Sequence, residues 1–130
     1  MLTTALYAGL LGLIFFFLSA AVISGRRKHG ISLLDGGNND FARTIRGHAN
    51  FAEYVPITLI LMGIGEVNGS PLTFLHVVGL ALLVGRIAHA WAFLYGPNIF
   101  ARQVGMLLTF AALGIAAANC IYQGLPVISG

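Results

Sequence analysis

Long apolar runs separated by short polar segments make up most of the pattern along the chain. A helix needs about 20 mostly apolar residues to cross the hydrocarbon layer of a bilayer. The pattern predicts four spans, at about residues 4–24, 41–65, 72–95 and 104–122. Short connections make consecutive helices antiparallel neighbours. The expected fold is therefore all-α: one domain over residues 1–130, built as an up-down bundle of four transmembrane helices.

The segments between the runs carry turn and cap signals. Gly36–Gly37 indicates a turn in the first connection, and residues 96–98 indicate a tight turn in the third. In the second connection, Ser70 is expected to cap the next helix, with Pro71 at its first position. No basic residue precedes the first run, which is also longer than the core of a signal peptide, so we expect it to remain as a span.

The basic residues predict the orientation. All seven Lys and Arg residues lie in the first or third connection, or in the halves of the runs beside them: Arg26, Arg27, Lys28, Arg43, Arg46, Arg86 and Arg102. Cytoplasmic loops of membrane proteins are enriched in Lys and Arg. We therefore expect the first and third connections in the cytoplasm and both termini outside.

Composition agrees with a membrane protein. Of 130 residues, 58% are hydrophobic and 8% are charged, and the mean hydropathy is +0.88; soluble domains carry about 25% charged residues. The pI of 9.5 could indicate nucleic-acid binding, but no basic patch with interleaved aromatic residues accompanies it. We expect lipid and no nucleic acid around the chain. Cys120 is the single cysteine, which excludes an internal disulfide and favours an apolar filler.

A polar stripe enters the second run. Arg43, Arg46, Asn50 and Glu53 are spaced three, four and three residues apart, so they share one face of a helix. Charges within a membrane are costly and by default mark functional sites. Pro56 follows and is expected to bend the helix near Glu53.

Two interpretations of this stripe stay open. Glu53 could pair with Arg86 of the third run simply to hold two helices together. Alternatively, several donors and one acceptor on one face suit a small zwitterionic or anionic ligand, because Arg binds carboxylates and a carboxylate binds an ammonium group. Arg43 and Arg46 are not needed for a purely structural pair, so the ligand interpretation is favoured.

The third and fourth runs add fewer polar groups and more small residues. Arg86 and Phe93 share a face with His89 at its edge, and His89 could be no more than a hydrogen-bonded histidine. Arg102 could be an interfacial anchor. Small residues predict close helix packing. They are Ala81, Gly85, Ala88 and Ala92 in the third run, and the close-packing face of the fourth run has Gly105, Thr109, Ala112, Ala116 and Asn119. The histidines lack metal-ligand spacing, so no metal is expected.

Together these motifs resemble a known family. Arg46-x-His48-x-Asn50-x-x-Glu53, the run Gly85–Arg86–Ile87–Ala88–His89 and Arg102 are similar to the signature positions of the MAPEG proteins, the membrane-associated proteins in eicosanoid and glutathione metabolism. The chain resembles a short bacterial-type member. The resemblance implies a homotrimer in a bacterial inner membrane, with glutathione as co-substrate between neighbouring subunits near the cytoplasmic face.

The resemblance also implies roles for single residues. Arg46, Asn50, Glu53 and Arg86 would hold the tripeptide, and the other implied contacts are Arg43, His89, Phe93 and, from an adjacent subunit, Arg26 or Arg27. Arg102 matches the position of the arginine that stabilises the glutathione thiolate. Phe93 stands where several family enzymes have a tyrosine, and Gln103 where the prostaglandin-type branch has a serine. Both departures disfavour isomerisation of the prostaglandin type.

The expected function is therefore a membrane transferase or peroxidase that uses glutathione on small hydrophobic electrophiles. Two alternatives stay open. One is a scaffold of the same fold that binds lipid or glutathione without catalysis. The other is a small four-span exporter that uses one membrane glutamate, Glu53, although the arginines around it would repel a cationic cargo.

Overall fold

The computed structural model describes residues 1–96 and 98–126, and within them it holds four helices and no strand. They are α1 (Leu2–His29), α2 (Asn39–Val67), α3 (Leu72–Leu94) and α4 (Ile99–Gly124). The predicted all-α bundle is confirmed. The helices α1, α2 and α4 run past the predicted spans, because those spans counted only apolar residues.

The helix ends show why the boundaries differ. The side chains of Asn38 and Asn98 accept hydrogen bonds from Phe41 N (3.0 Å) and Ala101 N (2.9 Å), and so cap α2 and α4 at their polar starts. The expected cap at Ser70 is wrong, because Pro71 occupies the cap position of α3 without a side-chain bond. The first turn is confirmed at Gly36–Gly37, where both φ angles are positive. Position 97 of the third turn lies outside the described residues.

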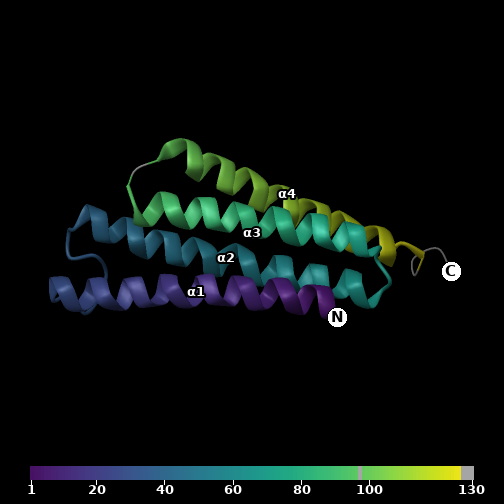
Figure 1. Ribbon diagram of the computed structural model, residues 1–130, viewed down its shortest axis with the longest axis horizontal. Helices are drawn as coiled ribbons and strands as arrows, with labels where there is room; N and C mark the ends of the chain where they lie inside the picture. The colour runs from purple at the N-terminus through teal and green to yellow at the C-terminus, as the bar shows by residue number, and fades with distance from the viewer. Residues whose placement is uncertain (97, 127–130) are drawn as a thin grey trace.

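The four helices run alternately up and down an elongated bundle (Figure 1). The helices α2 and α3 form its centre. The flanking helices α1 and α4 each pack on both central helices but not on each other. Polar residues of α2 can therefore face α3 and α4 while its opposite side packs on α1.

Three of the predicted spans, α1, α3 and α4, are long and apolar enough to cross a membrane. The helix α2 is as long as α1 but does not reach the same hydropathy. Its first half carries Asp40, Arg43, Arg46 and Glu53. The chain is an integral membrane protein. Its helix α2 places charged residues beside three apolar helices.

Small residues bring α3 and α4 into close contact. A Cβ added to Gly105 would lie 2.7 Å from the carbonyl oxygen of Gly85 and 2.8 Å from Cβ of His89. Of the residues expected on the packing face of α4, Asn119 is partly buried and the others are buried: Gly105, Thr109, Ala112 and Ala116. The predicted close-packing face is confirmed, and it fixes His89 against the first turns of α4.

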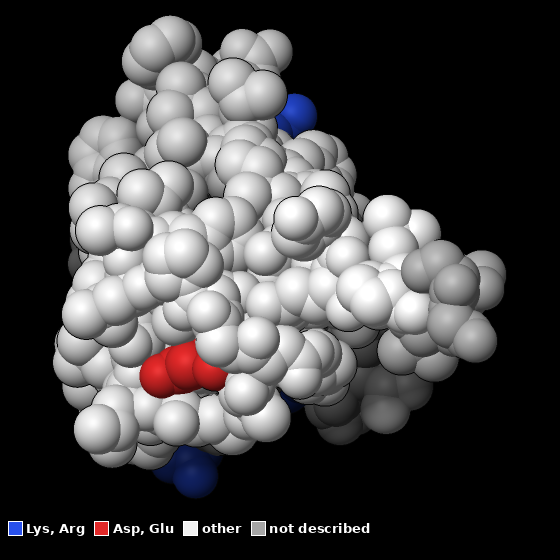
Figure 2. Space-filling model, turned by 90° about the vertical axis from the view of Figure 1, so that its right-hand side faces the viewer, with Lys and Arg blue, Asp and Glu red and all other residues white. Residues whose placement is uncertain are grey.

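The two ends of the bundle differ in charge. At one end, which we call the basic end, lie the connection between α1 and α2 and the start of α4, with Arg26, Arg27, Lys28, Arg43 and Arg102. The other end, which we call the Glu66 end, holds the first residues of α1, the turn between α2 and α3, and the last turns of α4. Figure 2 faces the Glu66 end and shows an almost uncharged surface with one small acidic area.

Glu66 closes its end by binding the start of α1. Its carboxylate oxygens accept hydrogen bonds from Thr3 N (2.9 Å) and Thr4 N (2.8 Å), and the ammonium group of Met1 lies 3.7 Å away. The Thr4 side chain, these N–H groups and the ammonium lower the pKa of Glu66 from 4.5 to about 2, against the opposing effect of burial. Beside it, Asn119 and Gln123 of α4 donate to the Ser70 hydroxyl.

Candidate functional site

The polar stripe of α2 faces two directions at the basic end. Seven residues make about two helical turns, so Arg43 and Asn50 stack on one line of α2 and Arg46 and Glu53 on a neighbouring line. The first line points toward α3 and α4, as the hydrogen bond from Arg86 to Asn50 shows. The second line lies on the exposed side of α2. We call the line of Arg43 and Asn50 the floor of the site and the line of Arg46 and Glu53 its rim.

The line of Arg43 meets Arg102 at Phe93. These three side chains come from α2, α4 and α3, and with Ala92, Asn98 and Ile99 they line a cavity of about 70 Å³. The guanidinium carbon of Arg102 lies 6.0 Å from the centre of the Phe93 ring, at the outer limit of a cation–π contact. Two arginines thus line the same small space, and the guanidinium group of Arg102 lies near an aromatic ring. Arg43 Nη1 also forms an ion pair with the exposed Asp40, at 3.1 Å.

Arg46 and Glu53 form an open ion pair on the rim. Arg46 Nη1 lies 3.4 Å from Glu53 Oε1, and their side chains are 66% and 46% exposed. Exposed pairs of this kind contribute about 0–1 kcal/mol. Breaking this pair therefore costs little free energy, and both side chains are available to bind a ligand.

Arg86 is held in the interior below Asn50. It is fully buried, and its Nη1 donates to Asn50 Oδ1 at 2.9 Å. Its Nη2 donates to Nδ1 of His89 at 3.2 Å, and its guanidinium carbon lies 5.1 Å from the ring centre of Phe51. Among the described residues, the simple pair of Glu53 with Arg86 does not form, because each has another partner.

The basic residues of α1 differ in availability. Arg26 Nη1 donates to the carbonyl oxygens of Ser32 (3.1 Å) and Leu34 (3.3 Å), so Arg26 folds onto the connection of its own chain. Arg27 is exposed. Of the two residues predicted to reach an adjacent subunit, Arg27 is the exposed one.

A larger cavity of about 620 Å³ lies at the same end between α1, α2 and α3. Its lining includes Arg43 and Phe93, so it adjoins the small cavity at Arg102. Its volume is in the usual range for ligand pockets, about 300–1,000 Å³. The basic end therefore has both cationic side chains and cavities that could hold a ligand.

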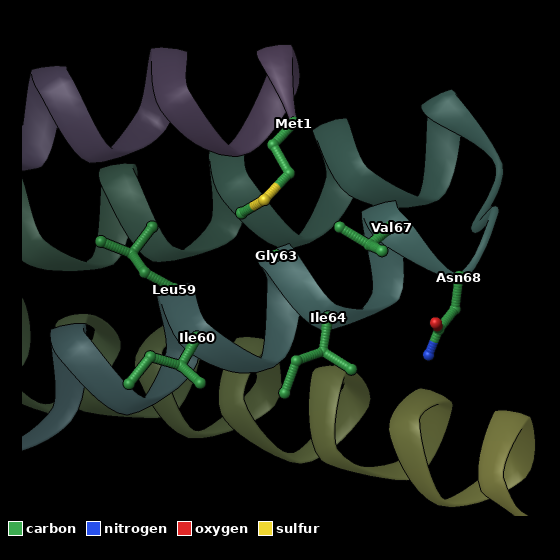
Figure 3. A pocket seen from close by; sticks show the side chains of 7 residues that line it. All are labelled: Met1, Leu59, Ile60, Gly63, Ile64, Val67 and Asn68. Carbon is green, nitrogen blue, oxygen red and sulfur yellow. The ribbon is translucent and has the colours of Figure 1, made fainter.

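The groove at the Glu66 end has different chemistry. It has a volume of about 550 Å³ and runs along α2 beneath the side chain of Met1, past Leu59, Ile60, Ile64 and Val67 (Figure 3). Asn68 at its end is the polar member of the lining. This groove accommodates hydrocarbon and presents no charged side chain to a polar ligand.

Two further histidines, His48 and His76, join helices. His48 Nε2 lies 3.0 Å from the Ser19 hydroxyl of α1, and His76 Nδ1 lies 3.0 Å from the Tyr7 hydroxyl. In the part of the chain that the structure describes, no three His, Cys, Asp or Glu residues lie close enough to hold a metal ion.

Comparison with known proteins decides the family. The model of the MAPEG family matches residues 4–122. The chain belongs to the MAPEG family. It is 35% identical to the inner membrane protein YecN of Escherichia coli K12 over 113 residues, which are 86% of this chain and 85% of that protein. YecN of Escherichia coli O6:H1 gives the same values.

Membership makes this a membrane protein of the eicosanoid and glutathione metabolism type, and the stripe and Arg102 lie within the matched residues. One polar neighbour of the stripe, Tyr54 of α2, is not among the residues predicted from the sequence. Its ring packs edge-on against Phe110 of α4, with centroids 5.2 Å apart. The signal was its position four residues after Asn50, which places it on the line of Arg43 and Asn50.

Proposed function

We propose that this MAPEG protein is a glutathione-dependent transferase or peroxidase that acts on lipophilic electrophiles in the membrane. The observation that carries the proposal is the meeting of Arg43 and Arg102 at Phe93, beside the open Arg46–Glu53 pair. A ligand with two carboxylates, one ammonium group and one thiol matches this set of charges.

The rim and the floor suit different parts of glutathione. The carboxylate of Glu53 can bind the ammonium group of the tripeptide, while Arg46 and Arg43 can each form two parallel hydrogen bonds with a carboxylate. The amide of Asn50 adds a neutral contact between them. Because Arg46 and Glu53 already form a weak exposed pair, the ligand replaces one exposed contact with several.

Arg102 is the proposed catalytic residue. The thiolate is the reactive form of glutathione, and a neighbouring arginine lowers the thiol pKa from about 8.5. With a chlorinated nitrobenzene, the thiolate sulfur bonds to the ring carbon, the C–Cl bond breaks, and chloride leaves with the bonding electrons. With a hydroperoxide, the sulfur attacks one oxygen, the O–O bond breaks, and the other oxygen gains a proton to form an alcohol. A second glutathione then reduces the sulfenic acid to a disulfide and water.

The proposal includes a homotrimer, with glutathione between subunits. A charged rim on the outer side of a membrane helix is costly against lipid, and a neighbouring protein surface offsets that cost. The exposed Arg27 can reach the rim of the next subunit. By the positive-inside rule, the basic end faces the cytoplasm of a bacterial inner membrane, where glutathione would enter.

Conjugation of 1-chloro-2,4-dinitrobenzene by the purified protein in detergent tests the proposal. We expect glutathione to bind in a calorimeter and Arg102→Ala to lower kcat by about 100-fold with a smaller change in binding. Lys28→Ala is the matched control, because Lys28 is a basic residue of the same end outside the cavities. Equal rates for wild type and Arg102→Ala would contradict a catalytic role for Arg102. Absence of glutathione binding would overturn the proposal.

One observation favours the scaffold alternative. Phe93 borders the cavity without a hydroxyl group, and that cavity has only about 70 Å³. A non-catalytic member would bind glutathione with unchanged affinity in Arg102→Ala and would turn over no electrophile in a broad panel that includes cumene hydroperoxide.

A further inference from the structure

Among the described residues, Arg86 is the only Lys, Arg, Asp or Glu side chain that is buried, and it lacks a carboxylate partner there. A buried cation without an acidic partner is costly. A residue kept under such conditions needs a role. The contacts of Arg86 define that role, because a guanidinium group can only donate hydrogen bonds.

The bond from Arg86 fixes the orientation of the Asn50 amide. Arg86 Nη1 lies 2.9 Å from the Asn50 side chain, and only the amide oxygen can accept from it. Asn50 Oδ1 therefore points inward to Arg86. Its Nδ2 has no hydrogen-bond partner among the described residues and is therefore left to donate to a ligand.

His89 fixes Arg86 in turn. Since Arg86 Nη2 donates to Nδ1 of His89 at 3.2 Å, Nδ1 carries a lone pair and the ring proton is on Nε2. The His89 backbone is pressed against Gly105 of α4. The Phe51 ring covers the guanidinium group from α2. Arg86 is thus held from α2, α3 and, through His89, from α4.

We infer that Arg86 is a positioning residue and does not contact the ligand: it orients Asn50 so that Asn50 Nδ2 donates to a carboxylate or carbonyl oxygen of the bound thiol peptide. The inference rests on the proposed function. It replaces the direct contact between Arg86 and glutathione that the family resemblance implied. Full burial of Arg86 is the reason: Asn50 is partly exposed, whereas Arg86 has no exposed surface for a ligand to contact.

A double-mutant cycle on glutathione affinity, measured by calorimetry on the full-length protein in detergent, separates the roles. The variants are Asn50→Ala, Arg86→Gln and the double variant. We expect each single change to raise Kd by about 10-fold, and the double change to raise it no further. An additive effect of about 100-fold would mean that Arg86 contacts the ligand itself, and would overturn the inference.

Two further variants keep the test independent of folding. Arg86→Lys retains a donor for Asn50 Oδ1 and should restore most of the affinity lost in Arg86→Gln. Asn50→Asp keeps an oxygen for Arg86 and replaces the amide donor with an acceptor, so it should weaken glutathione binding. The unfolding temperature of this variant should be at least as high as that of the wild type. Loss of thermal stability in Arg86→Gln with unchanged Kd would show a purely structural residue. Failure of the wild type to bind would overturn the proposed function as well, whereas binding with additive variants overturns only this inference.

Discussion

Glu53 and Glu66 belong to the same helix, yet their surroundings are opposite. The Glu66 side chain is 13% exposed and accepts two backbone hydrogen bonds at 2.8 and 2.9 Å from the start of α1. The Glu53 side chain is 46% exposed and has one contact of 3.4 Å to an exposed arginine. One carboxylate is saturated within the fold, and the other is available.

The difference separates stabilisation from recognition. At the Glu66 end, the Glu66 carboxylate and the amides of Asn119 and Gln123 form hydrogen bonds within the fold, and the groove beside them is apolar. Two buried oxygens of this end, Thr4 Oγ1 and Gln123 Oε1, have no hydrogen-bond partner among the described residues. At the basic end, cations border cavities and their pairs are weak and exposed. A charged ligand would therefore form few new interactions at the Glu66 end and several at the basic end.

The largest expected effect is stabilisation by glutathione. At a free concentration 100 times Kd, glutathione should raise the free energy of unfolding by about 2.7 kcal/mol. Glu66→Gln should retain this increase, and Glu53→Gln should lose most of it because the ammonium group loses its partner. Thermal unfolding in detergent with and without glutathione measures both. If glutathione raised the free energy of unfolding equally in both variants, the contrast between the two ends would be wrong.

Removal of the Glu66 carboxylate comes next. Glu66→Ala leaves Thr3 N and Thr4 N without acceptors, and loss of a capping acceptor costs about 1–2 kcal/mol. Glu53→Ala, on the same helix, should cost less than about 0.5 kcal/mol in the absence of ligand. Chemical unfolding of the two variants side by side measures the difference. A larger loss in Glu53→Ala would reverse the assignment of the two glutamates.

The third effect depends on pH. Because the folded protein holds the pKa of Glu66 at about 2, below its usual 4.5, the unfolded chain takes up a proton first as the pH falls. The contribution of Glu66 is complete above pH 4.5 and is lost between pH 4.5 and about 2. Melting temperatures of wild type and Glu66→Gln should therefore converge in this window. A constant difference down to pH 2.5 would contradict the lowered pKa.

The smallest effect concerns the rim. Arg46→Gln should change the stability of the ligand-free protein by no more than about 0.5 kcal/mol, because its partner and its own side chain are exposed. The same variant should weaken glutathione binding. Denaturant titration of the ligand-free variant, compared with its calorimetric Kd, checks both parts. A large loss of stability would mean that this pair holds the fold together.

The spacing of apolar, small and polar residues was enough to predict much of the fold and part of the site. Apolar length predicted the helices, and small residues at helical spacing predicted close-packing faces on α3 and α4. The structure added that Gly85 and Gly105 of these faces pack on each other. Spacing also placed Arg43, Arg46, Asn50 and Glu53 together on α2. It did not separate floor from rim, because neighbouring lines of one helix face differ by only part of a turn.

The sequence by itself determined which residues are apolar, where the basic residues cluster and which side chains share a helix face, since these depend on order along the chain alone. The tertiary structure decided the partners between helices: Arg86 with Asn50, and Glu66 with the start of α1. Partners depend on which helices pack against each other and at what height, and residues 36 or 63 positions apart meet only when the bundle closes.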